Sequence, residues 1–408
     1  MSSAATSQPI VRVSTRSSTD YLDGLRGVLI LLVLLLHIYF LTGRDSLLLG
    51  RLQGSFPWYL ETFRWFYPGL FTVGLFVVVS GYCLMLPVAR SADRRMTGGV
   101  LDYVRRRARR ILPPYYAAAL LSLGHNWLCR SEYYPWQNPF SKWDIVSHIF
   151  VFYNFNLQWR FQINGPYWSL APEWQLYLLF PILLVPAWRI LGTVGLMAAS
   201  LAGTVALILS SANIRDMHPW FLWLFTVGML AAIITESKEG WCVAWRERIP
   251  WGIVACALFG AFAVEWVVVW FRFAYIWERL IPVWQTYCLN ETLLGTAIGC
   301  SIIHWTEVRR YRPMAEWPRV LQLLHHPKVM FLGRFSYSHY LVHFPILIST
   351  SALVLSFHLP LLQTMVLSFL ISIPTSLGLS YLFFLAVERQ FLPKRLARIE
   401  HVPAAATA

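Results

Sequence analysis

Long apolar runs separated by short polar segments recur along the whole chain. The first run, Tyr21–Phe40, is long enough to cross a bilayer, since about 20 residues at a rise of 1.5 Å each span the hydrocarbon core. The later runs are Gly69–Val88, Ile111–Leu123, Asn164–Leu184, Leu191–Leu209, Pro219–Thr235, Trp251–Phe271, Val283–Trp305, Val329–Ser349 and Leu361–Val387. The pattern predicts an all-α, polytopic membrane protein, a bundle of about ten transmembrane helices.

Composition agrees with this class. Hydrophobic residues make up 57% of the chain and charged residues 13%, well below the roughly 25% charged residues of soluble domains. The net charge of +14 resides in arginines between the apolar runs, which is typical of cytoplasmic loops, so no nucleic-acid partner is expected. The six cysteines are scattered without a CxxC pair, which argues against a zinc site or a disulfide framework.

The basic residues also predict the orientation. With the N-terminus in the cytosol, most of the 34 Lys and Arg residues fall in inner segments, and ten spans return the C-terminus to the same side. We therefore expect a multi-pass protein of an endomembrane or the plasma membrane with both termini cytosolic. Residues 1–19 form a polar, disordered cytosolic tail without a signal peptide, 20–392 form the membrane domain, and 393–408 form a second cytosolic tail.

Two ionisable residues interrupt the first run. Arg26 and His37 return to the same face of one helix, about 16 Å apart along its axis. Both are costly in lipid, so they face a protein interior or a wet cavity. Two interpretations stay open at this point: a functional pair, or a snorkelling arginine and a hydrogen-bonded histidine.

An arginine-rich segment, Ala89–Arg110, precedes the third run. Such a segment marks a cytoplasmic loop, and any single arginine there is explained by topology and anionic lipid. Arg107 and Arg110 are three positions apart and share a helical face, so together they can clamp a phosphate, with Arg106 beside them. Pro113 and Pro114 are expected to break or bend the helix just beyond.

The fourth run begins with the segment NGPYWSLAPE, in which Trp168, Ser169 and Glu173 stand at a helix start. Pro172 suits the first turn, and Ser169 is a candidate N-cap. A carboxylate at Glu173 is favoured by the helix dipole alone, and a catalytic or orienting role is the equal alternative.

Polar residues also gather in the ninth run, GRFSYSHYLVHFPIL. Ser336, Tyr337, Tyr340 and His343 recur at helical spacing and are expected to face the same interior as His37. For Tyr337, interhelical hydrogen bonding without chemistry is the better explanation, and for His343 the two explanations are equal. Glu265 and Glu291 are further intramembrane carboxylates, for which we expect structural pairing with an arginine of a neighbouring helix.

Five segments together resemble a known family. Arg26 and His37 in the first span, GLFVVVSGY (Gly74–Tyr82), RRRARRILPPYY, WSLAPE and GRFSYSHYLVH resemble, in the right order, the acyltransferase-3 family of integral-membrane acyltransferases. The resemblance extends from about Tyr21 to Leu392. The chain is similar to stand-alone fungal members that act on secondary metabolites.

The resemblance implies an O-acyltransferase that moves an acyl group, commonly acetyl, from cytosolic acyl-CoA to a hydroxyl of an acceptor. It implies catalytic roles for Arg26, His37 and Glu173, acyl-CoA binding by Arg106, Arg107 and Arg110, and supporting roles for Trp168, Ser169, Ser336, Tyr340 and His343. No bound cofactor or metal is implied. Ala171 and Pro172 stand where the family has an aliphatic pair, and the hydrolase domain fused to some bacterial members is expected to be absent, so one module performs the reaction.

The chemistry fits these roles. A hydroxyl that attacks a thioester needs a base, and a neutral imidazole at His37 is suited to it. Glu173 then orients or stabilises the imidazole, and Arg26 binds donor phosphate or stabilises the oxyanion. We expect direct transfer, because Cys83 lies in an apolar run without a group that favours its thiolate.

Two alternatives differ in substrate or in class. The first is acylation of a cell-surface glycan in place of a small hydrophobic acceptor such as a secondary metabolite. The second is a polytopic transporter in which Arg, Glu and His form a substrate or proton path. The sequence has no internal repeat and no matching pair of interrupted helices, which disfavours transport.

Overall fold

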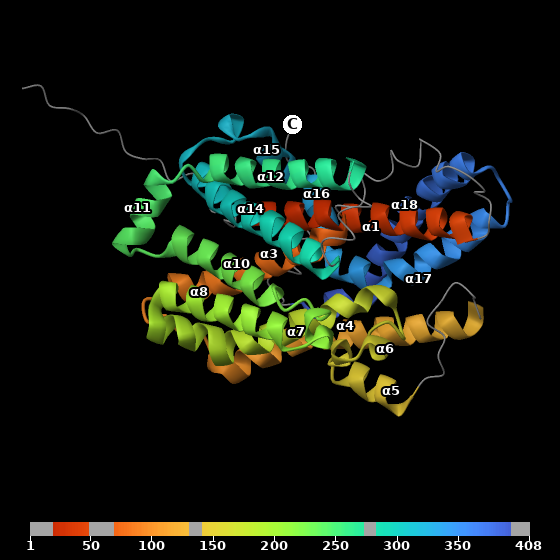
Figure 1. Cartoon of the computed structure of the whole chain (residues 1–408), viewed down its shortest axis with the longest axis horizontal. Coiled ribbons are helices and arrows are strands. Elements are labelled where there is room, and N and C mark those ends of the chain that lie inside the picture. The colour runs from red at the N-terminus through yellow and green to blue at the C-terminus, as the bar shows by residue number, and fades with distance from the viewer. Residues whose placement is uncertain (1–18, 49–68, 130–140, 273–282, 393–408) are drawn as a thin grey trace, which may run out of the picture.

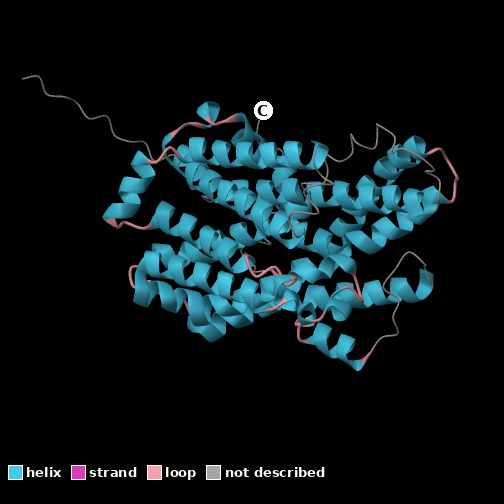
Figure 2. Ribbon diagram, in the orientation of Figure 1, coloured by secondary structure: helices cyan, strands magenta, loops and turns pink. Residues whose placement is uncertain are grey.

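The computed structural model describes residues 19–48, 69–129, 141–272 and 283–392 (Figure 1). Helices and loops make up the described residues, and no strand occurs among them (Figure 2). The α-helices are α1 (Asp20–Leu48), α3 (Thr72–Arg90), α4 (Gly99–Cys129), α5 (Lys142–Ile149), α6 (Leu157–Arg160), α7 (Leu170–Leu179), α8 (Val185–Ser210), α9 (Ala212–Arg215), α10 (Phe221–Glu236), α11 (Gly240–Arg248), α12 (Trp251–Arg272), α14 (Val283–Tyr311), α15 (Arg319–Leu324), α16 (Pro327–Arg334), α17 (Ser336–Leu355) and α18 (Leu361–Ala386). The 3₁₀ turns are η2 (Tyr153–Phe155), η3 (Gly165–Ser169), η5 (Met314–Glu316) and η6 (Glu388–Phe391), and η4 (Phe180–Leu184) is a π-helical turn.

Several helices are long and apolar enough to cross a membrane. By length and hydropathy, five stretches of the described chain qualify, and a sixth is the α10–α11 pair, which is bent by 95°. The five are Asp20–Thr42, Gly69–Arg90, Gly165–Ser210, Ser336–Leu355 and Leu361–Ala386. The predicted all-helical membrane protein is therefore confirmed, whereas the count of ten spans stays a prediction. The two predicted tails lie outside the described residues, except for Thr19.

The stretch Gly165–Ser210 contains 46 residues, which as one straight helix would be about 70 Å long, more than twice the hydrocarbon thickness. Gly192 interrupts it with φ 69° and ψ −174°, a backbone conformation that residues other than glycine rarely adopt. The break lies next to the predicted boundary between the fourth and fifth spans. The helix nevertheless continues through residues 185–190, where the prediction places a loop.

Two further boundaries differ from the prediction. The predicted span Val329–Ser349 is divided, because Phe335 leaves helical geometry (φ −107°, ψ 19°) between α16 and α17. Its ring packs between Phe331 and Tyr381. By contrast, α4 continues unbroken through Pro113 and Pro114, so of the predicted break or bend only a bend stays a prediction.

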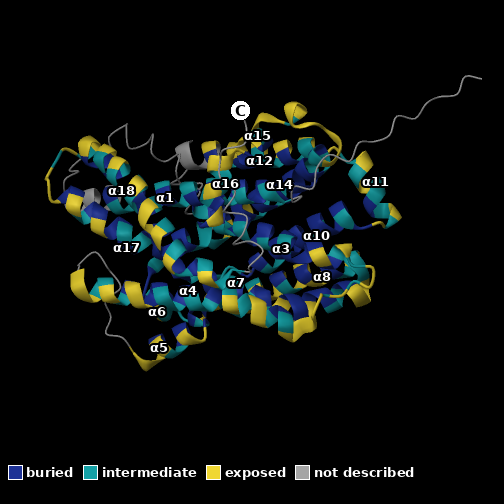
Figure 3. Ribbon diagram, turned by 180° about the vertical axis from the view of Figure 1, so that it is seen from behind, coloured by how far each residue is buried: buried dark blue, intermediate teal, exposed yellow. Residues whose placement is uncertain are grey.

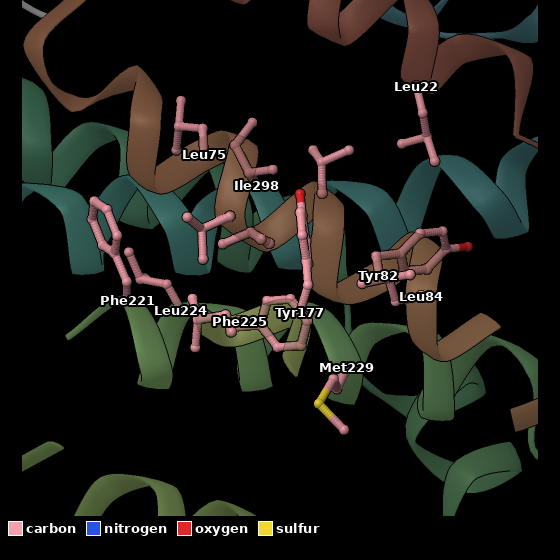
Figure 4. Close-up of a cluster of buried hydrophobic side chains, with 14 of the residues drawn as sticks. Leu22, Leu75, Tyr82, Leu84, Tyr177, Phe221, Leu224, Phe225, Met229 and Ile298 are labelled. Atoms are coloured by element: carbon pink, nitrogen blue, oxygen red, sulfur yellow. The ribbon is translucent and has the colours of Figure 1, made fainter. Parts of the chain in front are cut away.

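The core lies between α3, α10 and α14, where Leu75, Phe225 and Ile298 pack together (Figure 4). A Cβ atom on Gly81 of α3 would overlap the carbonyl oxygen of Phe225, and one on Gly228 of α10 would overlap that of Val78. The backbones of α3 and α10 thus approach as closely as small residues allow in membrane helix pairs.

The outer faces of α8 and α18 expose apolar side chains, as expected for helices in lipid (Figure 3). Helix α18 shows the pattern most clearly: Leu370, Leu379 and Leu382 are exposed. Its buried face carries hydroxyl side chains at every fourth position, namely Thr364, Ser368, Ser372, Ser376 and Ser380. A soluble amphipathic helix has the reverse arrangement, so α18 is built for a lipid surround.

Candidate active site

A cavity of about 1030 Å³ runs through the bundle between α1, α3, α4, α7 and α17. The structure brings nine of the predicted site residues to its wall: Arg26, His37, Arg107, Arg110, Trp168, Ser169, Glu173, Ser336 and Tyr340. His343 lies directly behind the wall, fully buried and in contact with His37. Arg106 is the exception: it is exposed, pairs with Asp102 and Thr97, and does not line the cavity.

The cavity has two distinct ends, whose positions are given by the contacts between α1 and α3. At one end Arg26 of α1 contacts Cys83 of α3, and at the other Leu32 and Leu36 of α1 lie against Gly69 before α3. His37 belongs to this second end, about 16 Å along α1 from Arg26. We call them the arginine end and the histidine end.

At the arginine end, Arg107 and Arg110 project from one face of α4, as their spacing predicts. The guanidinium of Arg107 lies 5.9 Å from the ring centre of Tyr103 and 5.8 Å from that of Tyr177, so the two rings hold its position. Arg110 experiences the charges of Arg107, Arg26 and Glu388. Three cations therefore surround one part of the cavity, which is an arrangement suited to a multivalent anion.

Arg26 donates hydrogen bonds to Asp23 at 2.8 Å and to the sulfur of Cys83 at 3.3 Å. The second contact corrects an expectation. The sequence indicates no cation near Cys83, because Arg26 is 57 positions away in the chain and meets it only through the packing of α1 on α3. Cys83 also lines the cavity.

At the histidine end, Nδ1 of His37 lies 3.0 Å from the carbonyl oxygen of Val33 and 3.4 Å from Nε2 of His343. The Nδ1 of His343 in turn lies 2.9 Å from the carbonyl of His339. Because carbonyls only accept, both Nδ1 atoms carry hydrogens in the neutral rings. The lone pair of His343 Nε2 then faces the Nδ1–H of His37, and Nε2 of His37 is left as the basic nitrogen.

Glu173 stands in the first turn of α7, directly after Pro172, as predicted. Its carboxylate accepts a hydrogen bond from the hydroxyl of Tyr177 at 3.1 Å, and Ser80 contacts the same hydroxyl at 3.0 Å. No hydrogen bond joins Glu173 to His37 in the described part of the chain. The sequence analysis missed Tyr177, although its position four residues after Glu173 is the signal that could have identified it.

Ser169 precedes α7, but its side chain does not cap the helix, so the predicted capping is wrong. Residues Gly165–Ser169 form a 3₁₀ turn that continues directly into α7, and Ser169 is already helical (φ −83°, ψ −20°). Its hydroxyl donates to Tyr340 at 3.2 Å, and Tyr340 donates to the carbonyl of Pro166 at 2.8 Å. Tyr337 makes the expected interhelical hydrogen bond, to the carbonyl of Ile111 at 2.8 Å.

Glu388 is a wall residue that no sequence motif indicates. It is 1% exposed and accepts hydrogen bonds from the backbone N–H of Ser338 at 3.0 Å and from the hydroxyl of the same residue. Burial raises the pKa of this carboxyl above its usual value. Glu388 interacts with Arg110, so when it is ionised it offsets part of the positive charge at the arginine end.

The all-helical bundle, its lipid-type surface and an interior cavity with charged side chains in its wall define a multi-pass integral membrane protein with a built internal site. The family model described as "Acyltransferase domain" matches residues 19–385, nearly the whole chain. The chain therefore belongs to the acyltransferase-3 family of membrane acyltransferases, as its motifs predict. No curated protein and no solved structure matches the chain.

Proposed function

We propose that this protein is an O-acyltransferase that moves an acyl group, in particular acetyl, from acyl-CoA to a hydroxyl of a small hydrophobic acceptor. The observation that carries the proposal is the division of one cavity into an arginine end and a histidine end. One end suits a polyanionic donor and the other offers a base for a hydroxyl. A secondary metabolite is the kind of acceptor that fits a cavity with this much apolar wall.

The arginine end is the proposed donor site. Arg107 and Arg110 bind the phosphates of CoA, because guanidinium groups recognise phosphate with paired, charge-assisted hydrogen bonds. Arg26 joins them. It lies about 16 Å from His37 along a continuous helix, too far to contact a thioester that His37 serves. Of its two expected roles, phosphate binding therefore fits better than oxyanion stabilisation, and the pantetheine arm reaches toward His37.

The histidine end is the proposed reaction centre. The acceptor oxygen attacks the thioester carbonyl while Nε2 of His37 takes the hydroxyl proton. The C–S bond then breaks, and CoA leaves as a thiolate that is protonated to the thiol. His343 positions His37 by accepting from its Nδ1–H, and Glu173 faces the same cavity, where its negative charge favours the imidazolium that forms.

We further propose direct transfer within a ternary complex of enzyme, acyl-CoA and acceptor. Cys83 is the residue at which a covalent intermediate is to be sought, because it is a thiol in the cavity wall in contact with Arg26. Intact-mass measurement after incubation with acetyl-CoA is expected to show no acetyl adduct. A stable adduct on Cys83 that is discharged by acceptor would replace direct transfer by a two-step reaction.

For the orientation of the protein in the membrane, we keep the one that the distribution of Lys and Arg predicts. With ten spans and both termini in the cytosol, the arginine end faces cytosolic acyl-CoA and the histidine end faces the opposite side of the membrane. Acyl-CoA then enters from the compartment in which it is made.

The experiment that tests this function is the release of free CoA from acetyl-CoA by detergent-purified protein, with water or 2-phenylethanol as acceptor. The proposal predicts turnover in detergent, where no gradient exists. A transporter without acyl chemistry would release no CoA. Acetyl-, butyryl- and palmitoyl-CoA compared in the same assay define the acyl length that the cavity accepts.

A further inference from the structure

Trp168 forms part of the cavity wall, but its indole is supported from behind by a residue outside the cavity. The ring of His218 lies 4.5 Å from that of Trp168, inclined by 33°. Aromatic rings at this distance and angle attract each other. His218, which belongs to the turn between α9 and α10, is therefore the nearer of two rings that hold Trp168 in place, the other being Phe221.

His218 is itself held in an uncommon conformation. Its backbone has φ 57°, in the left-handed region that non-glycine residues enter at some cost. Nδ1 of His218 lies 3.4 Å from Oε2 of Glu291, and the indole N–H of Trp220 donates to the same carboxylate oxygen. The two contacts determine the direction in which the imidazole faces Trp168.

Glu291 is a fully buried carboxylate of α14, in the predicted span Val283–Trp305, and burying a carboxylate is costly. The expected structural pairing is present, but among the described residues the partners of Glu291 are His218 and Trp220 rather than an arginine. Its other oxygen, Oε1, has no hydrogen-bond partner in the described part of the protein. Gly74 of α3 provides the space for it, because a Cβ there would lie 3.2 Å from the Cβ of Glu291.

The position of this group along α3 places it away from the donor. Gly74 precedes Cys83 by nine residues, about 14 Å of helix, and Cys83 marks the arginine end. At this end of α3 the cavity wall includes the apolar side chains of Leu70, just before the helix, and Val73 within it, and the arginines that line the described cavity belong to other segments. This region suits a neutral ligand with an apolar face rather than the phosphates of CoA.

We propose that Trp168, His218 and Glu291 form the acceptor subsite. The indole face of Trp168 binds the flat apolar body of a neutral, hydroxyl-bearing acceptor, and the His218–Glu291 pair positions the indole. The inference rests on the proposed acyl transfer and specifies its acceptor class: an alcohol with an aromatic or similarly flat ring, rather than a polyhydroxylated glycan.

The test uses three alcohols as probes with acetyl-CoA: 2-phenylethanol, n-octanol and glycerol. The parent protein is expected to transfer acetyl to 2-phenylethanol with the lowest KM and to glycerol with the highest. Equal transfer to glycerol, or transfer to none of the three while CoA is released to water, overturns the subsite but not the acyl chemistry. A parent that releases no CoA at all overturns the proposed function and the subsite with it.

The variants then assign the residues. Trp168→Ala is expected to raise the KM for 2-phenylethanol about tenfold relative to the KM for acetyl-CoA. Trp168→Phe keeps an aromatic face, so its KM for 2-phenylethanol should stay close to that of the parent. His218→Asn removes the ring while tolerating the left-handed backbone, and a rise of about threefold to tenfold is expected. Glu291→Gln should give a smaller rise in the same direction.

His326→Asn is the matched control, since His326 is exposed and outside the cavity. Binding of CoA by each variant shows that it is folded. If Trp168→Ala and His218→Asn bind CoA and leave the KM for 2-phenylethanol unchanged relative to that for acetyl-CoA, the acceptor does not contact this wall and the proposal fails.

Discussion

The two ends of the cavity differ in the charge of the side chains that line them. The arginine end gathers Arg26, Arg107 and Arg110 around one volume, and Glu388 is the buried carboxyl beside them. The histidine end holds imidazoles that meet each other and backbone carbonyls, as in the His37–His343 contact. A site for a polyanion needs fixed positive charge, whereas a general base must be uncharged before it acts. Under the proposed function, donor binding and proton transfer are therefore spatially separate.

The largest effect is expected at the histidine end. His37→Ala should lower kcat for acetyl transfer by about 10²–10⁴-fold, the usual contribution of a positioned general base, with little change in the KM for acetyl-CoA. The parent should also lose activity on acidification, because a protonated imidazole cannot accept the hydroxyl proton. Steady-state CoA release measures both, with His326→Asn as control. Full activity of His37→Ala would move the base elsewhere, with His343 next.

Substitutions at the arginine end should change the KM for acetyl-CoA. Arg107→Ala and Arg110→Ala are each expected to raise the KM for acetyl-CoA by about tenfold or more, since a hydrogen bond to a charged group contributes about 1.5–3 kcal/mol. Arg106→Ala is the matched control, because Arg106 is on the same helix but is exposed and pairs with Asp102. If Arg106→Ala raised KM as much as the other two, overall basic charge rather than a built site would bind the donor.

A smaller effect should separate positioning from chemistry. His343→Ala removes one of the two acceptors for the Nδ1–H of His37 and leaves only the carbonyl of Val33, so kcat is expected to fall about tenfold, with the KM for acetyl-CoA retained. His343→Gln supplies an amide oxygen in its place and should recover part of the loss. Equal kcat losses in both variants, with normal CoA binding, would show that the loss of the imidazole rather than of an acceptor is responsible.

The smallest effect concerns Glu388. Because burial raises the pKa of this carboxyl above the ordinary value of 4.5, the folded protein holds its proton more tightly than the unfolded chain. Its contribution to stability is therefore full below that ordinary value and is lost as the pH rises through the raised pKa. Thermal unfolding in detergent should show the parent falling by about 1–2 °C relative to Glu388→Gln between pH 4 and pH 8. Parallel curves would mean that Arg110 already compensates the buried charge.

Much of this arrangement follows from local periodicity. Arg26 and His37 share a face of α1, and Arg107 and Arg110 share one of α4, because spacing along one helix determines direction. The Glu173–Tyr177 contact is equally local and was open to the same reasoning. The acyltransferase family follows from the order of the motifs, and the matching family model confirms it.

The remaining contacts depend on packing between helices distant in sequence. The Arg26–Cys83, His37–His343 and Ser169–Tyr340 contacts each join two elements whose register no local pattern determines. His218 gives no sequence signal, since its role follows from a left-handed turn that places it behind Trp168. The division at Phe335 was not predicted either, although Gly333 and Arg334 before it and Ser336 after it interrupt the apolar run.

Equilibrium binding of acetyl-CoA to the parent, to His37→Ala and to the Arg107→Ala/Arg110→Ala double variant tests the separation of the two ends most directly. Binding is measured without turnover, so it isolates the donor site from the chemistry. We expect the parent and His37→Ala to bind with the same Kd and the double variant to bind at least about tenfold more weakly. Loss of binding in His37→Ala with retention in the double arginine variant would contradict the account, because the donor would then be held at the histidine end.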